Sequence, residues 1–241
     1  TPDAVRVVRF VKRAQQLGFI LDDIEDLLHL AQGGPASCDE ARTMARTRID
    51  DLQQRIDELA GMRDALARLV TKEVGKPYAE ALGEVREIVD TCDFFLGEGR
   101  RLYGQTVPSE MPDKQLFTFR NPVGAVAVIT AGNFPVAVPS WYIVPALLTG
   151  NTVVWKPAEY SAAVSNAFHE LFVRGGGLPD GVFNLVHADG EQTFAGLQSA
   201  LEAGHIDKVG FTGSSAVGRE IGALTGRHLQ TACLELGGKN P

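Results

Sequence analysis

The sequence predicts an α/β protein in which a mostly parallel sheet follows an all-α segment that ends in a long helix of the dimerisation type. The first observation is compositional: residues 1–70 are charge-dense, and most of the 26 glycines come later. The second is that short Val- and Ile-rich runs alternate with helical stretches punctuated by Gly and Pro from residue 71 onward, as βα units do. We therefore predict two domains, residues 1–70 and 71–241.

Composition narrows the class of protein. The 241 residues are 44% hydrophobic, which is enough for one large core or two modest ones. The net charge of −7, from 23 Lys and Arg against 30 Asp and Glu, argues against a general polyanion-binding surface. Three widely separated cysteines argue against a disulfide framework, so we expect a reducing, cytoplasmic setting. The chain begins without a signal peptide, and prolines break the uncharged stretch 121–155, so we expect no membrane span.

Helical periodicity predicts three helices in the first domain. The first ends at Gly18, a residue suited to a helix stop. The second covers "LDDIEDLLHL", with two aspartates in its positively polarised first turn. Ser37 and Glu40 fit a capping box that begins a long third helix. An alternating three-four spacing of apolar residues runs along this helix: Ile49, Leu52, Ile56, Leu59, Leu66 and Val70. Such a seam normally meets another helix, so we expect a homodimer through residues 39–70; the alternative is an ordinary core helix.

Cys38 is the chemically notable residue of the first domain. At a helix N-terminus the dipole and free N–H groups favour its thiolate, which is the form that binds a soft metal ion. One sulfur does not make a metal site, and the next cysteine along the chain is Cys92. A structural or inert thiol is the alternative interpretation.

Three stretches of the first domain resemble the effector-binding and dimerisation half of MerR-type transcription regulators: "VRVVRFVKRAQQLGFILDDIEDLLHL", "SCDEA" and "RIDDLQQRIDELAGMRDAL". The resemblance covers about residues 4–70, with Ile20 in place of the family's helix-capping Ser or Thr. It implies that Cys38 joins two cysteines of a partner chain in a soft-metal site. It also implies that the DNA-reading helix-turn-helix would precede Thr1, so we expect no DNA binding.

In the second domain, strands are predicted at "LFTFR", "VGAVAVIT", "NTVVWKP", "GVFNLVHA", "KVGFTG" and "CLEL", after a helix over about residues 79–103. This alternation favours a Rossmann-like sheet with right-handed crossovers. The usual G-x-G-x-x-G after the first strand is absent. In its place the strand runs into Ala131-Gly132-Asn133-Phe134-Pro135.

Six motifs in order resemble the aldehyde dehydrogenase superfamily over about residues 66–241: "TKEVGKP", "NPVGAVAVITAGNFP", "PALLTGNTVVWKPAE", "GGLPDGVFNLV", "DKVGFTGSSAVGREI" and "LELGGKNP". The resemblance implies that a cysteine thiolate attacks an aldehyde, that the thiohemiacetal passes hydride to NAD(P), and that water releases the acid. It places the nucleophilic cysteine beyond Pro241. We therefore expect an NAD(P)-dependent dehydrogenase fragment that lacks turnover by itself.

Two residues match catalytic positions of that family. Asn133 would donate its amide to the developing oxyanion; its alternative is an Asx-type turn. Glu235 would be the general base for the deacylating water, helped by burial that raises its pKa; its alternative is to accept N–H bonds from the Gly237-Gly238 turn. Cys233 shares a strand face with Glu235 but is not the nucleophile by this resemblance. Tyr142 stands where many members have Lys, which puts a proton relay there in doubt.

The cofactor residues follow the strand ends. Lys156 and Glu159 come just after a strand, where both can bond ribose hydroxyls, and the carboxylate favours NAD over NADP by repelling a 2′-phosphate. Gly213 allows close approach, and Ser214 at a helix N-terminus can hold a pyrophosphate or serve as an ordinary N-cap. The remaining residues at matched cofactor-lining positions are Thr130, Gly190, Phe211, Val217 and Leu236.

The phrase "MRDALARLVTKEVGKP" fits both families, so we hypothesise that two coding sequences meet there, by gene fusion or by assembly artefact. Three functional hypotheses follow. The first is an aldehyde-oxidising enzyme fragment with NAD. The second is a metal-responsive regulator fragment or regulator-enzyme fusion. The third is a helical tail without function on an incomplete sheet, whose exposed edge promotes aggregation.

Overall fold

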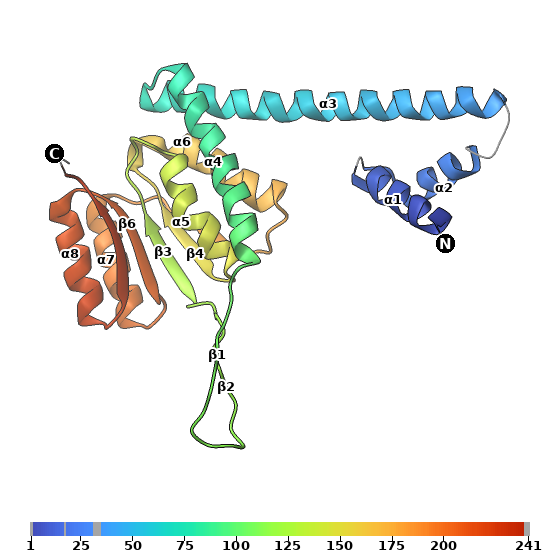
Figure 1. The fold of residues 1–241 in the computed structure, drawn as a ribbon. Coiled ribbons are helices and arrows are strands. Elements are labelled where there is room, and N and C mark those ends of the chain that lie inside the picture. The colour runs from blue at the N-terminus through green and yellow to red at the C-terminus, as the bar shows by residue number, and fades with distance from the viewer. Residues whose placement is uncertain (1, 17, 31–34, 239–241) are drawn as a thin grey trace. The chain divides into compact units, whose positions relative to one another are not determined.

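Glycine and a capping carboxylate set the ends of the first two helices. The computed structural model describes residues 2–16, 18–30 and 35–238 (Figure 1). Helix α1 (Pro2–Gln16) is followed by Gly18, whose φ of 79° is the left-handed conformation that favours glycine. Helix α2 (Leu21–Leu30) has no Ser or Thr cap; instead the Asp23 carboxylate accepts the N–H of Ile20 at 3.2 Å. Both helices confirm the sequence prediction.

The long third helix, α3, spans Pro35–Val74. The chain divides into two compact units, residues 1–62 and 63–241. The predicted seam behaves differently in the two units: Leu66 and Val70 are buried in the second, whereas Ile56 and Leu59 are exposed in the first. The seam is therefore a core face over its last turns only. The predicted domain boundary at residue 70 stays a prediction.

Two predictions in α3 lie outside what the structure describes. They are the capping box of Ser37 with Glu40 and the environment of Cys38, because these three side chains are not among the described ones. In the described part of the chain, no helix combines the length and the apolar character that crossing a membrane requires.

A five-stranded sheet forms the centre of residues 63–241, and every neighbouring pair of its strands is parallel. The strand order is β5-β4-β3-β6-β7. The bounds are β3 Ala125–Ile129, β4 Thr152–Lys156, β5 Phe183–Leu185, β6 Lys208–Gly213 and β7 Thr231–Leu236. This confirms the predicted α/β class with a parallel sheet. From β3, the next strands β4 and β5 are added on one side and the later strands β6 and β7 on the other. The carboxyl ends of β3 and β6 therefore flank the topological switch point, where such sheets bind ligands.

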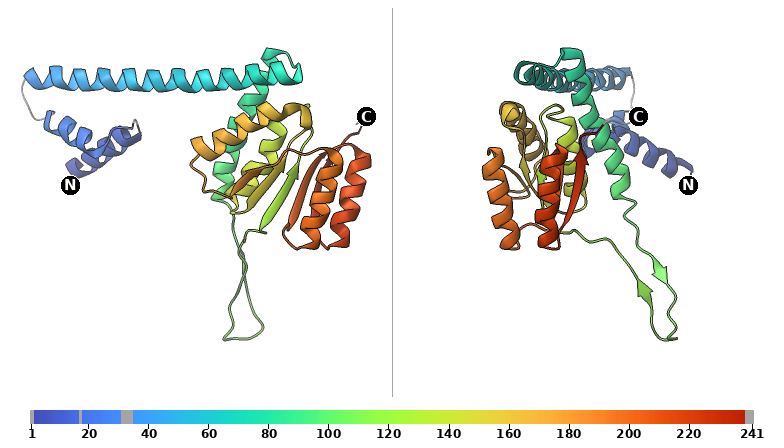
Figure 2. Two further views of the ribbon diagram at one scale, coloured as in Figure 1. Left: turned by 180° about the vertical axis from the view of Figure 1, so that it is seen from behind. Right: turned by 90° about the vertical axis from the view of Figure 1, so that its left-hand side faces the viewer.

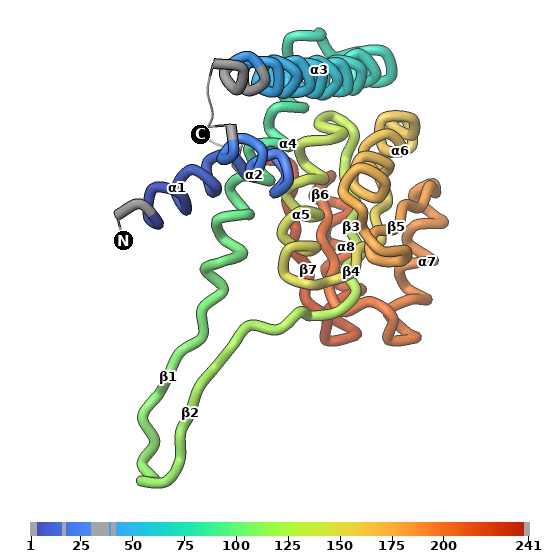
Figure 3. Tube along the Cα trace, turned by 90° about the vertical axis from the view of Figure 1, so that its right-hand side faces the viewer, coloured from blue at the N-terminus to red at the C-terminus, as the bar shows by residue number. Residues whose placement is uncertain are grey.

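One predicted strand is mostly wrong. Of "LFTFR" only Leu116–Phe117 is a strand, β2, and it pairs antiparallel with β1 (Thr106–Val107) outside the main sheet. The two strands form a ribbon that extends away from the five-stranded sheet (Figure 3). The aromatic residues of this stretch are exposed, with Phe117 and Phe119 both 66% accessible.

Helices cover both faces of the sheet (Figure 2). One face carries the helices α4 (Tyr78–Gly99), α5 (Ala137–Leu148) and α6 (Ala162–Glu170), the last continued by a π-helical turn, η2 (Leu171–Gly175). The other face carries α7 (Gly190–Glu202) and α8 (Ser215–Arg227). A 3₁₀ turn, η1 (Glu159–Ser161), follows β4.

The core on the α4–α6 face centres on an aromatic cluster. Trp155 of β4 is fully buried and lies edge-on to Phe168 and parallel to Phe183. Full burial of such side chains removes large apolar areas from water. This packing fixes β4, and with it the position of Lys156 at the carboxyl end of that strand.

Candidate functional site

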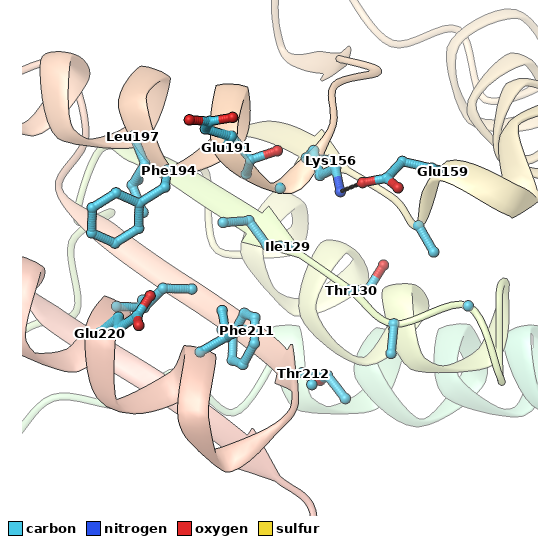
Figure 4. A pocket seen from close by; sticks show the side chains of 18 of the residues that line it. Ile129, Thr130, Lys156, Glu159, Glu191, Phe194, Leu197, Phe211, Thr212 and Glu220 are labelled. Atoms are coloured by element: carbon cyan, nitrogen blue, oxygen red, sulfur yellow. Dashed lines mark ion pairs between the residues drawn. The ribbon is translucent and has the colours of Figure 1, made fainter.

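A cavity of about 720 Å³ opens at the carboxyl ends of the central strands, between α7 and α8 (Figure 4). Its floor comes from Ile129 of β3 and Phe211 of β6, and its sides from Phe194 of α7 and Ile221 of α8. The volume lies in the range of cofactor pockets, about 300–1,000 Å³, and apolar walls with few polar groups are typical of them. The cavity also coincides with the topological switch point, where a nucleotide is expected.

Most of the predicted cofactor residues line this cavity. They are Thr130, Lys156, Glu159, Gly190, Phe211, Gly213 and Val217. Lys156 Nζ lies 3.6 Å from Glu159 Oε1, and Figure 4 marks this ion pair at one side of the cavity. The Lys156 side chain is 14% accessible and that of Glu159 is 60% accessible. The partly buried Lys156 ammonium can donate hydrogen bonds to sugar hydroxyls. The exposed Glu159 carboxylate beside it can accept hydrogen bonds from them.

Ser214 and Leu236 do not line this cavity. The Ser214 hydroxyl accepts the N–H of Val217 at 3.3 Å and so caps α8, the alternative role that the sequence left open. Leu236 packs against Gly218 of α8, where an added Cβ would come within 2.3 Å of the Leu236 side chain. Its role is therefore to pack α8 against β7.

The apolar wall of the cavity was not predicted from the sequence. Phe194 and Leu197 of α7 line it together with Ile129, which precedes Thr130. The available signal was helical periodicity, because Phe194, Leu197 and Leu201 recur at the spacing of one helix face. Thr130 was predicted, and its hydroxyl accepts the Trp155 Nε1–H at 3.0 Å.

The two predicted catalytic residues lie outside this cavity's described lining. Asn133 is exposed on the bend between β3 and α5. Glu235 is also exposed, which contradicts the predicted burial, because β7 is the edge strand and its Glu235 face is uncovered in the described chain. The Gly237 N–H donates to the Gly213 carbonyl at 3.2 Å, so this N–H does not serve the turn bond proposed as the alternative role of Glu235.

Tyr142 lies on the same face of the sheet as Glu235. Its hydroxyl bonds the Thr212 hydroxyl at 3.0 Å and the Phe211 carbonyl at 3.3 Å. Burial raises the pKa of Tyr142, the Thr212 bond lowers it, and the nearby charges of Cys233 and Glu235 raise it further. Tyr142 is thus a neutral hydroxyl held against β6. The burial pattern of β7 confirms the predicted strand alternation, which places Cys233 and Glu235 on one face.

Among the described residues, no group of three or more His, Cys, Asp or Glu is arranged to hold a metal ion. The predicted soft-metal ligand, Cys38, lies outside the described side chains. The metal prediction therefore has no structural support.

The family comparison matches most of the chain. The model described as "Aldehyde dehydrogenase family" matches residues 22–241. That range includes most of the segment compared above with MerR-type regulators, and none of the matches supports that resemblance or a join between two families.

Curated relatives agree with the family match. Aldehyde dehydrogenase family 7 member A1 of Pisum sativum is 39% identical over 228 residues, covering 91% of this chain and 43% of the relative. Alpha-ketoglutaric semialdehyde dehydrogenase of Bacillus subtilis is 40% identical over 192 residues, covering 80% of this chain and 37% of the relative. The chain thus spans about two fifths of the length of these relatives.

Solved structures have the same fold. A crystal structure of an NADP-dependent enzyme from E. coli is 39% identical, with a TM-score of 0.70 over 74% of this chain and 36% of that one. A betaine aldehyde dehydrogenase variant from Staphylococcus aureus, in complex with NAD+, is 33% identical, with a TM-score of 0.71 over 77% of this chain and 36% of that one. With the motifs, the switch-point cavity and the family match in agreement, the chain belongs to the aldehyde dehydrogenase family.

Proposed function

We propose that residues 71–241 are the cofactor-binding part of an NAD(P)-dependent aldehyde dehydrogenase, an enzyme that oxidises an aldehyde to a carboxylic acid. The observation that carries the proposal is the switch-point cavity, which has the volume for a dinucleotide and is lined by the residues that the sequence singles out. Bound NAD would accept the hydride. The chain's own part is to hold the cofactor between α7 and α8 and to present Lys156 and Glu159 to its ribose.

We assign Asn133 as the oxyanion donor and Glu235 as the general base. Both side chains are exposed, and Glu235 lies on the face of β6 and β7 that carries Thr212, to which Tyr142 of α5 is hydrogen-bonded. An amide donor stabilises charge that appears on an aldehyde oxygen. A carboxylate within reach of a water can take its proton. The Tyr142 hydroxyl supplies hydrogen bonds on this face where many relatives would have a cation.

NAD is the preferred cofactor in this proposal, because Glu159 places a carboxylate at the cavity mouth, where it would repel a 2′-phosphate. Calorimetric titration of the chain with NAD and with NADP tests this. We expect tighter NAD binding, and we expect Glu159→Gln to bring the two affinities together. The matched control Glu170→Gln, on α6 outside the cavity lining, should leave the ratio unchanged. The proposed function would be refuted if neither NAD nor NADP bound to the chain.

We also propose that residues 1–241 bind NAD without turning over aldehydes, because the resemblance places the nucleophile beyond Pro241. Burial, reinforced by the charge of Asp93, raises the pKa of the Cys92 thiol, which leaves it a poor nucleophile at neutral pH. An NADH absorbance assay with propanal should show no turnover. Sustained turnover that is lost in Cys92→Ser or Cys233→Ser would assign the nucleophile to this chain instead.

The partner that we propose for α3 is a second copy of this chain, in a homodimer. Exposed apolar side chains line it before residue 63: Ile49, Ile56, Leu59 and Met62. Their three- and seven-residue spacing forms one stripe, which a second copy of the helix would cover. Sedimentation should show a dimer that Ile56→Glu converts to a monomer, with Arg55→Glu as the control. A monomeric parent chain would disprove the dimer.

No observation in the described residues favours the regulator alternative.

A further inference from the structure

A buried ion pair lies beside the segment that carries Asn133. Glu84 of α4 is 3% accessible, and its Oε2 accepts Lys76 Nζ at 2.8 Å. The Lys76 side chain is itself only 11% accessible. A charge pair this far from water is costly to form and persists only when hydrogen bonds satisfy both partners.

The other oxygen of the Glu84 carboxylate reaches the start of α5. Glu84 Oε1 accepts the N–H groups of Val136 at 2.9 Å and of Ala137 at 3.2 Å. Helix α5 has no side-chain cap of its own and no acidic residue in its first turn. The carboxylate of the neighbouring helix α4, which packs beside α5 (Figure 1), therefore supplies the acceptors and the negative charge that a helix N-terminus lacks.

Lys76 contacts the other side of the same segment. Its Nζ lies 3.8 Å from the centre of the Phe134 ring, the residue directly after Asn133. A cation at this distance from an aromatic face is attracted to it. The ion pair therefore holds the chain at Phe134 through Lys76 and at Val136 and Ala137 through Glu84.

The segment is also fixed before Asn133. The Thr130 N–H donates to the Lys156 carbonyl at 3.2 Å, and the Thr130 hydroxyl is bound by Trp155. Gly132 packs so closely under Tyr160 that an added Cβ would lie 2.6 Å from the ring. Asn133 is thus an exposed amide on a short bend whose two flanks are both immobilised.

We propose that Lys76 and Glu84 are positioning residues for Asn133, which fix the bend of residues 132–137 so that the amide is presented in one orientation. The role assigned to Asn133 rests on the proposed function, but the positioning does not require it. Preorganised donors are effective because they need no reorientation when charge develops. If Glu84 served only as a cap of α5, its carboxylate would hold Val136 and Ala137 equally well in the absence of Lys76.

NMR spectroscopy of the full chain separates positioning from capping. In Lys76→Met, which leaves Glu84 in place, we expect the Asn133 side-chain amide and the Phe134 ring resonances to shift and broaden. Lys76→Arg, which keeps the cation, should restore them. Glu84→Gln should shift the same resonances and increase hydrogen exchange at Val136 and Ala137 by about tenfold or more relative to Val128 of β3. Glu80→Gln, one turn earlier on α4 and exposed, is the matched control.

Two results would overturn the proposal. One is an unchanged Asn133 amide resonance in Lys76→Met. The other is exchange in Glu84→Gln that rises equally at Val128, Val136 and Ala137, since that indicates general destabilisation. Calorimetric titration of the same samples with NAD keeps the two proposals apart. An Asn133 amide resonance that is unchanged in Lys76→Met while NAD still binds refutes only this inference, whereas absence of NAD binding to the parent chain refutes only the proposed function.

Discussion

Several polar side chains in the second unit are buried and paired with partners outside their own helix or strand. Thr130 with Trp155 and Glu84 with Lys76 are examples. Thr130, Trp155 and Lys76 lie in motifs that the sequence singles out, "NPVGAVAVITAGNFP", "PALLTGNTVVWKPAE" and "TKEVGKP", whereas Glu84 lies in none of them. The motif indicates that the residue matters, but its partner follows from the fold, because hydrogen bonds between elements have no sequence periodicity.

Replacing Thr130 by Val should destabilise the second unit. The substitution removes the acceptor of the fully buried Trp155 Nε1–H, and an unpaired buried donor costs about 1–3 kcal/mol. Urea unfolding followed by tryptophan fluorescence measures it, since Trp141 and Trp155 both report on this unit. Thr231→Val, at an exposed position of β7, is the control. Equal midpoints for the two variants would contradict the assigned bond.

The two described cysteines should react at different rates. Cys233 is exposed, whereas Cys92 is partly buried and has a raised pKa, first from desolvation and then from the Asp93 charge. Iodoacetamide labelling at pH 8, resolved by peptide mapping, should modify Cys233 first. The raised pKa of Cys92 also links the stability of the fold to pH. The stability contributed by the neutral thiol is fully present below the ordinary thiol pKa, and it is lost as the pH rises through the raised value. Faster labelling of Cys92 would disprove its assigned environment.

Helices and core strands were the elements that the sequence predicted best. Their signals are local: Gly18 ends α1, and Val- and Ile-rich runs mark β3 and β4. The β1–β2 ribbon was predicted poorly because its aromatic residues are exposed, and exposure of an apolar run depends on what packs over it. The same limit explains Glu235, whose exposure follows from the edge position of β7 and not from its neighbours in sequence.

Two glycines in different elements should respond oppositely to alanine. A Cβ on Gly210 of β6 would lie 2.6 Å from the Tyr142 ring, so the ring must move and weaken its bond to Thr212. We expect a loss of about 1–3 kcal/mol. Gly83 lies inside α4 with open space around it, so Gly83→Ala should gain about 0.5–1 kcal/mol. Urea unfolding compares them, and changes of the same sign would refute this packing.

At the scale of the whole molecule, the second unit is a sheet with one face complete and the other partly covered. Helices α7 and α8 cover β6 and β7 on one side, while Cys233 and Glu235 face outward on the other. An exposed edge strand promotes association with other chains. Glu235 lies on this uncovered side, whereas the cofactor cavity lies on the covered side. The sequence predicted the residues of both groups but not their separation, which depends on which face of each strand the helices cover.

The central claim is that a dinucleotide binds at the switch point of the sheet, between α7 and α8. Hydrogen exchange measured by mass spectrometry, with and without saturating NAD, tests it most directly. We expect protection confined to the segments that line the cavity, residues 129–132, 156–160, 190–198 and 211–221, with the β1–β2 ribbon unchanged. Protection elsewhere, or no protection at an NAD concentration that calorimetry shows to be saturating, would contradict the account.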